Sequence, residues 1–459
     1  MSSIFTSFTL QNPVAPRLPA APIEYDQRYQ DQFLNILRLY FNQLDNVLGQ
    51  ILATDTPIPI SIGGTNVDAF NRLRVSNPFT LFDSSHRYAD NNLWASKTTG
   101  TATVAFNAAQ GLVDLTIGTA LNDEIVRETI KVFSYQPGKS LLVMNTFIMA
   151  ATKAGLRQRV GYYGEDNGIY IEQDGTSVYM VERSLVTGVV TETKVAQANW
   201  NQDPLNGTGP SGLTLDLTKA QILYMDIEWL GVGTVRTGFV IDGNFIPAHN
   251  FNHANEITST YVTTASLPLR YEIKNVAATA SSSTLKQVCS TVISEGGYTL
   301  NGAQLSVGTS ITAPRTLTTA GTLYTVVSLR LKTTRLDAIV ILTAISLLGI
   351  TNNSNYKWEV VASGTTTGGT WVSAGTNSAV EYNLSGTFAV GTGRVLASGY
   401  FQGSNQGSTS IDILKQALFA FQLERNPFTA TPYELTLAVT ASSNGDQVHA
   451  SMDWEEISR

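Results

Sequence analysis

Residues 28 to 51 are the one long stretch of this chain with a strongly helical pattern. Apolar side chains recur in it at alternating spacings of four and three residues: Phe33, Leu37, Tyr40, Leu44, Val47 and Ile51. This spacing is typical of a coiled-coil seam, which packs against a partner helix. Ile36, Phe41 and Leu48 make the stripe wider than a two-stranded coil needs. The helix must therefore pack on β domains of its own chain or on copies of itself, and we expect self-association, most simply a trimer.

The segments on either side of this helix are predicted to be extended. Prolines at three-residue intervals between Pro13 and Pro22 indicate an arm over 1–27 that orders only against something else. Gly49, Pro57 and Pro59 are expected to end an oligomerisation helix over 28–53. Residues 54–90 then form a connector.

The rest of the chain has the pattern of β-sandwich or jelly-roll domains. Short runs rich in aromatic and β-branched residues alternate with turn sequences such as Asp174-Gly175 and Asp242-Gly243. No helical segments separate these runs, so we expect antiparallel sheets in a mainly β protein. A small-residue stretch over 278–283 divides a first sandwich, 91–277, from a second, 278–459.

Composition excludes several classes of function. Charged residues make up 14% of the 459 residues, against about a quarter in typical globular proteins. The formal charge of −7 argues against nucleic-acid binding, which needs a basic face. The single cysteine, Cys289, permits no intrachain disulfide and fits folding in a reducing cytoplasm. With neither a signal-peptide pattern nor an apolar run of about 20 residues, we expect a soluble protein without membrane contact.

Asp226 and Glu228 are the candidate catalytic pair. Strand residues two apart face the same side, roughly 7 Å from each other, and retaining glycosidases need two carboxylates about 5 to 5.5 Å apart. The segment resembles the acidic strand of jelly-roll β-glucanases, but Tyr224 stands where those enzymes carry a third acid. The ordinary alternation of apolar and polar residues along a strand predicts the same sequence without any catalytic role, with both acids on the face exposed to solvent. We therefore expect no catalytic residues.

Other candidate sites also have simpler explanations. His249 and His253 have a metal-ligand spacing, but Pro247 and the intervening asparagines indicate a loop, and no Cys or carboxylate completes a site nearby. We expect no metal and no cofactor. Four aromatic residues, which we expect to be exposed, could stack on sugar rings, although such residues are more often core or interface: Tyr162, Tyr163, Tyr170 and Trp200.

Two segments, 21–46 and 68–83, resemble virion structural proteins of tailed bacteriophages, especially phages of cyanobacteria and marine bacteria. The resemblance continues more weakly through 135–140, 161–164 and 270–275, so it covers about 21–275. Similar proteins usually have Gly at the position of Asn71, and Asn tolerates a positive φ well. The resemblance implies a protein of the head, tail or fibre, and it supplies no catalytic residues.

These observations predict a non-enzymatic virion component. Residues 1–53 would dock on other virion proteins and form a homo-oligomer, while the sandwiches project from the particle as a tail, fibre or capsid-surface element. One alternative is a receptor-binding protein that recognises a host-surface glycan. A more distant one is a jelly-roll glycoside hydrolase.

Overall fold

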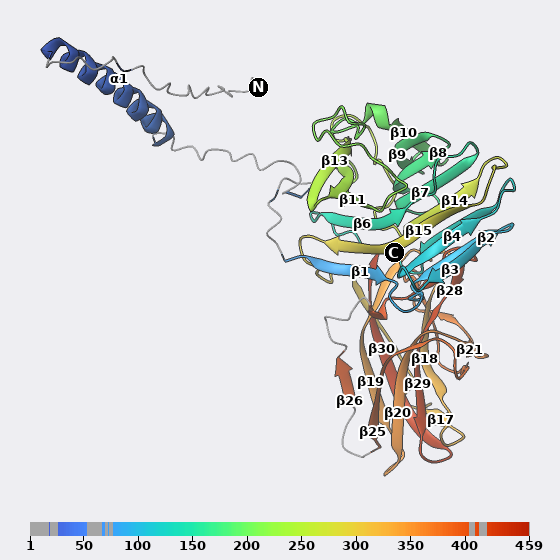
Figure 1. Ribbon diagram of the computed structural model, residues 1–459. Coiled ribbons are helices and arrows are strands. Elements are labelled where there is room, and N and C mark those ends of the chain that lie inside the picture. The colour runs from blue at the N-terminus through green and yellow to red at the C-terminus, as the bar shows by residue number, and fades with distance from the viewer. Residues whose placement is uncertain are drawn as a thin grey trace. The chain divides into compact units, whose positions relative to one another are not determined.

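The computed structural model describes residues 18, 26–52, 67–68, 72, 77–403, 409–412 and 420–458. The chain divides into two units, residues 1–63 and residues 64–459, which are treated separately below. The first contains helix α1 and the second contains antiparallel β-sheets, as Figure 1 shows. The predicted fold class, mainly β with one N-terminal amphipathic helix, is confirmed. Among the described helices, none combines the length and hydropathy that crossing a membrane requires.

Helix α1 extends from Gln27 to Leu52. The Asp26 carboxylate accepts a hydrogen bond from the backbone N–H of Arg28 at 2.9 Å, which satisfies one of the free donors at the helix start. The predicted range of 28–53 agrees with this to within one residue at each end, and Gly49 lies inside the last turn. The Val47 and Ile51 side chains lie outside the described part of the chain.

The first sandwich consists of two large sheets. The eight-stranded sheet has the order β13 (Asn244–Phe251), β12 (Val235–Ile241), β11 (Gln221–Ile227), β6 (Leu141–Ile148), β15 (Ser283–Ser294), β4 (Leu112–Ile117) and β3 (Thr103–Asn107), with β1 (Phe79–Ser85) also paired to β15. The seven-stranded sheet has the order β10 (Thr191–Ala196), β9 (Ser177–Ser184), β8 (Gly168–Asp174), β7 (Leu156–Tyr163), β14 (Leu269–Asn275), β5 (Glu124–Thr129) and β2 (Trp94–Thr99). A short 3₁₀ helix, Gln197–Asn199, follows β10.

The second sandwich is built in the same way. Its five-stranded sheet has the order β16 (Ala303–Gly308), β30 (Asp446–Ser458), β19 (Ile339–Gly349) and β26 (Thr409–Asp412), with β17 (Arg315–Leu317) on β30. Its six-stranded sheet has the order β22 (Val372–Ser373), β23 (Val380–Asn383), β18 (Tyr324–Leu331), β29 (Glu434–Ala441), β20 (Asn355–Gly364) and β25 (Arg394–Gln402). Two short pairs complete it: β21 (Thr366–Thr367) with β24 (Thr387–Phe388), and β27 (Arg425–Asn426) with β28 (Thr431–Pro432).

The predicted hairpin turns are present. Asp242 and Gly243 join β12 to β13, and both have positive φ, 50° and 76°. Two successive positive φ angles match the right-handed twist of the flanking strands, which is why Asp-Gly is favoured there. Gly175 lies in the turn between β8 and β9 with φ 59°.

Strands β1 and β15 lie in the first sandwich, outside its predicted limits of 91–277. β15 pairs with β4, β6 and β1, and its Leu285 and Val292 belong to the first hydrophobic core. The small-residue stretch before it is held on the first sandwich, because Lys153 Nζ donates hydrogen bonds to the carbonyls of Ser281 and Ser282. The chain therefore enters the second sandwich after Ser294.

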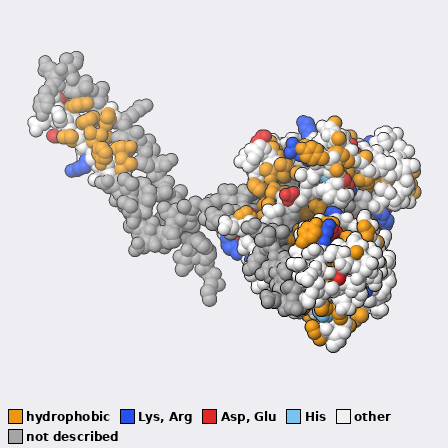
Figure 2. Space-filling model, turned by 90° about the horizontal axis from the view of Figure 1, so that it is seen from below, with side chains coloured by type: hydrophobic (Ala, Val, Ile, Leu, Met, Phe, Trp, Pro, Cys, Tyr) orange, Lys and Arg blue, Asp and Glu red, His pale blue; other side chains and the backbone are white. Residues whose placement is uncertain are grey.

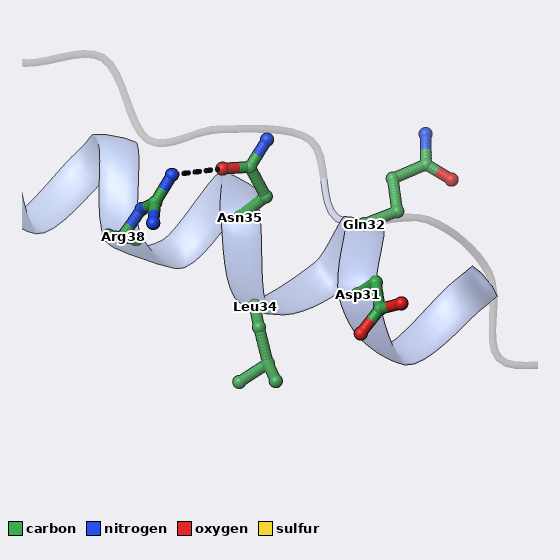
Figure 3. Close-up of a pocket in the computed structure, with 5 residues that line it drawn as sticks. All are labelled: Asp31, Gln32, Leu34, Asn35 and Arg38. Carbon is green, nitrogen blue, oxygen red and sulfur yellow. Dashed lines mark hydrogen bonds between the residues drawn. The ribbon is translucent and has the colours of Figure 1, made fainter. Parts of the chain in front are cut away.

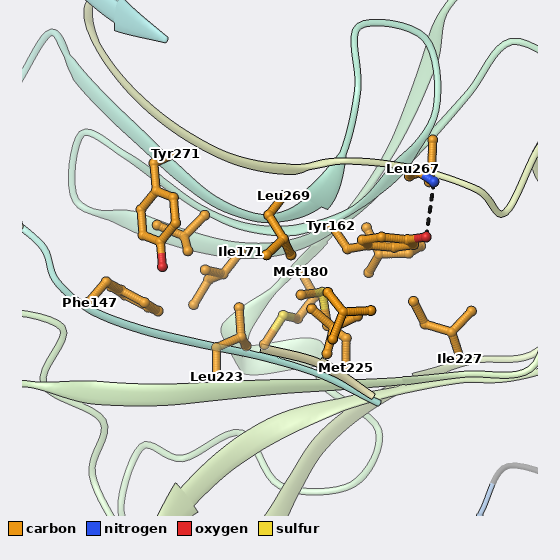
Figure 4. Close-up of a cluster of buried hydrophobic side chains, with 14 of the residues drawn as sticks. Phe147, Tyr162, Ile171, Met180, Leu223, Met225, Ile227, Leu267, Leu269 and Tyr271 are labelled. Carbon is orange, nitrogen blue, oxygen red and sulfur yellow. Dashed lines mark hydrogen bonds between the residues drawn. The ribbon is translucent and has the colours of Figure 1, made fainter. Parts of the chain in front are cut away.

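Each sandwich has its own hydrophobic core. In the first, Met225 and Leu223 of the eight-stranded sheet face Ile171 and Leu269 of the seven-stranded sheet (Figure 4). Tyr162 is buried among them. Its hydroxyl accepts a hydrogen bond from the Leu267 N–H at 2.9 Å and donates one to the Ala265 carbonyl at 2.8 Å, so its polar end is satisfied.

Candidate functional sites

The apolar surface of α1 is the first candidate site. Phe33, Leu37, Tyr40 and Leu44 of the predicted seam are half-buried, while Leu34, Leu39 and Phe41 are exposed by 56%, 54% and 57%. In the described part of unit 1–63, α1 is the only helix or strand. Large exposed apolar side chains gain free energy when they pack, so these residues are the candidate association surface of the helix.

The side of α1 opposite the predicted seam is mostly polar, although the exposed Leu34 and Leu39 border it. A shallow hollow there is lined by Asp31, Gln32, Leu34, Asn35 and Arg38, and Arg38 Nη2 donates a hydrogen bond to Asn35 Oδ1 at 3.0 Å (Figure 3). All five of these side chains are exposed.

The connector is anchored to the β unit at Val67. Arg236 on β12 donates from Nη2 to the Val67 carbonyl at 2.7 Å and to Asp226 Oδ2 at 2.5 Å. Just beyond, Asp68 binds Arg72 by an ion pair at 2.6 Å and accepts a hydrogen bond from the Arg72 N–H at 3.0 Å. Asp68 and Arg72 belong to the segment that resembles phage proteins. Their contacts link positions 68 and 72 where the chain enters the β unit.

The structure contradicts the solvated face expected for Asp226. Its side chain is fully buried, and its two oxygens accept hydrogen bonds from Ser140 and Arg236. Met225 and Ile227, its neighbours on β11, are buried in the first hydrophobic core. Glu228 lies after the end of β11, half-buried, and burial raises its pKa. Asp226 is thus part of the connector anchor, ion-paired rather than facing Glu228 across an open cleft.

The two candidate metal-binding histidines make separate contacts. His249 lies on β13, where its Nδ1 accepts a hydrogen bond from the Asn201 N–H at 3.3 Å and burial lowers its pKa to about 4. His253 lies in the following loop and stacks on Tyr261 with 4.0 Å between ring centroids. Among the described residues, no group of three or more His, Cys, Asp or Glu side chains is arranged to hold a metal ion.

His253 links the two sheets of the first sandwich. Its Nδ1 lies 2.6 Å from the Gly233 carbonyl, and its Nε2 lies 2.7 Å from Glu182 Oε2 on β9. Both partners are acceptors, so both ring nitrogens must carry protons. Burial favours the neutral ring, but Glu182 and the Gly233 carbonyl outweigh it and raise the pKa, with Glu256 adding to the effect.

We expect this contact to make stability depend on pH. The pKa of His253 is higher in the folded chain than its ordinary value of 6.5, so its contribution is fully present below about pH 6.5 and is lost as pH rises through the folded pKa. A His253→Leu variant should lose roughly 1 to 3 kcal/mol below pH 6.5 and less at about pH 9. Denaturant titrations across this range would measure it. His449→Gln, in the second sandwich, is the control variant. An equal loss of stability by His253→Leu at all pH values would contradict the assignment.

The four candidate stacking aromatics are buried, which corrects the idea that they are exposed: Tyr162, Tyr163, Tyr170 and Trp200. Tyr163 and Tyr170 lie on the face of the seven-stranded sheet opposite the core, with ring centroids 4.4 Å apart. Arg183 lies over both rings. Burial raises the pKa of Tyr163 well above its usual value, so its hydroxyl stays protonated.

Ion pairs surround these tyrosines. Arg159 pairs with Glu172 at 2.6 Å, and Arg183 pairs with Glu192 at 2.7 Å. Despite partial burial, hydrogen bonds from Arg183 and Tyr170 lower the pKa of Glu192 to about 2. Alternation along a strand indicates which face a residue lies on, but it cannot indicate that long charged side chains cover the aromatic rings.

A buried joint connects the two sandwiches, formed by residues 128–132 of the first and 422–425 of the second. The Arg425 N–H donates to the Ile130 carbonyl at 3.0 Å, and Gln422 Nε2 donates to the Val132 carbonyl at 2.8 Å. Arg425 Nη2 also donates to Glu128 Oε1 at 2.9 Å. Backbone and charged contacts together make this a specific, ordered connection.

Comparisons with known proteins identify no family for this chain. No family model and no curated protein matches it. Solved structures match at low similarity: the carbohydrate recognition domain of Emp47p has 10% identity, a TM-score of 0.28 and coverage of 48% of this chain and 96% of that one. A GH16 from the Bacteroides ovatus mixed-linkage glucan PUL has 10% identity and a TM-score of 0.32, with coverage of 46% of this chain and 99% of that one. The CBM2 module of the evolved Dit from Lactobacillus casei BL23 phage J-1 has 6% identity and a TM-score of 0.30, with coverage of 49% of this chain and 99% of that one.

Proposed function

We propose that this chain is a non-enzymatic structural component of a phage virion. Residues 1–53 would dock on other virion proteins and associate with copies of themselves, and the β unit would project as a tail, fibre or capsid-surface element. The observation that carries the proposal is the division of the chain at Gly63, which leaves an amphipathic helix with an open apolar stripe in a unit of its own.

Two features of the β unit support this role. The buried joint holds the sandwiches together through specific contacts, as a projecting element requires. Charged side chains are sparse on the face in Figure 2, where uncharged polar surface predominates. The burial and pairing of Asp226 favour a structural role over catalysis at this position.

Removal of residues 1–53 tests the proposal. The truncated chain is expected to stay folded, because both hydrophobic cores lie beyond residue 80, and to be absent from purified particles. Full-length chain carrying Gln32→Asp and Asn35→Asp on the polar face of α1 is the matched control and should be incorporated normally. Incorporation of the truncated chain at the level of the intact protein would contradict the proposal.

Recognition of a host-surface glycan is the second candidate. The Tyr88 ring is 80% exposed, with the Arg87 guanidinium 4.9 Å from its centroid, and an exposed ring of this kind can stack on a sugar. The intact protein would then bind susceptible cells, and Tyr88→Ala would weaken binding at least several-fold. Absence of any binding by the wild type would leave the structural role alone.

A further inference from the structure

Strand β25, Arg394–Gln402, is an edge strand of the six-stranded sheet of the second sandwich. Within the described residues, its only strand partner is β20. No other described strand pairs with the N–H and C=O groups on its other side, which can therefore accept a further strand. An edge of nine residues is long for a protein that stays monomeric, because such edges template association.

Other strands at the sheet margins carry features that prevent such pairing. β10 carries Glu192 and Lys194, β2 carries Lys97, and β1 carries Asp83. β13 contains Pro247 and an irregular register. The remaining terminal strands are short: β3 with five residues, β16 with six, β17 with three, β22 with two and β26 with four.

β25 has none of these protections over most of its length. It contains no proline, lysine or acid, and its one charged residue, Arg394, is ion-paired to Glu424 at 2.6 Å. Val395 and Tyr400 are exposed by 55% and 79%. An irregular register opposite Val360 and Val361 affects only the first residues of the strand. The edge is thus neutral, partly apolar and regular over 397–402.

This regular part is compatible with a copy of itself. Ser398, Tyr400 and Gln402 are exposed, while the residues between them are half-buried against β20, with Phe401 stacked on Tyr356 at 4.8 Å. In an antiparallel pair centred on one residue, exposed positions therefore oppose exposed positions. No like charges meet, because the segment carries none.

We propose that β25 pairs antiparallel with β25 of a second copy of this chain, so that the six-stranded sheet continues across two molecules. A contact of one surface with itself closes as a dimer and needs no second complementary patch. This contact is separate from any association through α1, and each can be removed without the other.

The test uses the full-length chain in solution, measured by light scattering. Ser398→Lys with Tyr400→Lys places like charges at the shared edge, and the mass is expected to fall two-fold. Thr103→Lys with Ala105→Lys adds the same charges at exposed positions of β3 and should leave the mass unchanged. An equal mass for wild type and the β25 variant would overturn the proposal.

Crosslinking distinguishes this contact from helix association. In a Cys289→Ser background, single cysteines at Ser398, Tyr400 and Gln402 are introduced one at a time. At least one should give a disulfide-linked dimer under oxidation, including in a chain with Leu37→Asp and Leu44→Asp in α1. Absence of linked dimers at all three positions would also overturn the proposal. Linked dimers would be absent in this way if a different protein paired with the edge of β25.

Discussion

Replacing Leu37 and Leu44 by aspartate is expected to reduce the solution mass of the full-length chain by the number of copies that α1 brings together, three-fold for a trimer. Both residues lie in the middle of the predicted seam. Burying a leucine stabilises an interface by roughly 1.5 to 3 kcal/mol. An unpaired carboxylate at the same position adds a desolvation penalty in every copy. Together, the lost leucine burial and the desolvation penalty exceed the free energy of association of a short helical bundle.

Light scattering gives the mass, and circular dichroism shows that the β unit remains folded. Gln32→Asp with Asn35→Asp, on the opposite face of α1, introduces the same charge and should leave the mass unchanged (Figure 3). A chain that starts at residue 54 should match the double-aspartate variant. A single-chain mass in the wild type would mean that α1 does not associate with copies of itself, and the anchored-oligomer proposal would fail.

Short-range patterns predicted the local structure well. The helix follows from apolar spacing over seven turns, and the hairpin at Asp242-Gly243 follows from residues that adopt positive φ at low cost. Such features depend on neighbours a few positions apart.

The errors arose where a partner is distant in the sequence. Alternation places Asp226 away from the core but cannot reveal that Ser140, 86 residues earlier, and Arg236 cover it. A composition shift suggested a boundary at residue 278, although β15 pairs with strands that begin more than a hundred residues earlier. Strand register is set by such contacts, and a single sequence does not display them.

The joint is the clearest example of a site without a sequence signal. Residues 422–425 contain no motif, and Gln422 contacts Val132, 290 residues earlier. At its centre, the Glu424 carboxylate is buried and accepts hydrogen bonds from Arg394 at 2.6 Å and Ser363 at 2.7 Å. Lys131 of the first sandwich lies 3.5 Å from it. One carboxylate thus neutralises two cations where the sandwiches meet.

A Glu424→Ala variant is therefore expected to lose about 3 to 5 kcal/mol of stability, because it removes the buried carboxylate that lies 3.5 Å from the Lys131 ammonium and 2.6 Å from Arg394. Burial already lowers the pKa of Lys131, and Glu424 opposes that shift. Without the carboxylate, the charged form of Lys131 is less favourable, and this weakens the contact between the sandwiches.

Denaturant unfolding, followed by tryptophan fluorescence and circular dichroism, measures this loss. Because the joint couples two separate cores, the variant should unfold in two resolved steps, and the wild type in a more cooperative transition. Glu381→Ala is the matched control: it removes a partly exposed Arg330 pair of 3.1 Å in the same sandwich and should cost no more than about 1 kcal/mol. If Glu424→Ala lost as little stability as Glu381→Ala, the joint would not hold the sandwiches together. The β unit would then behave as two independent domains on a linker.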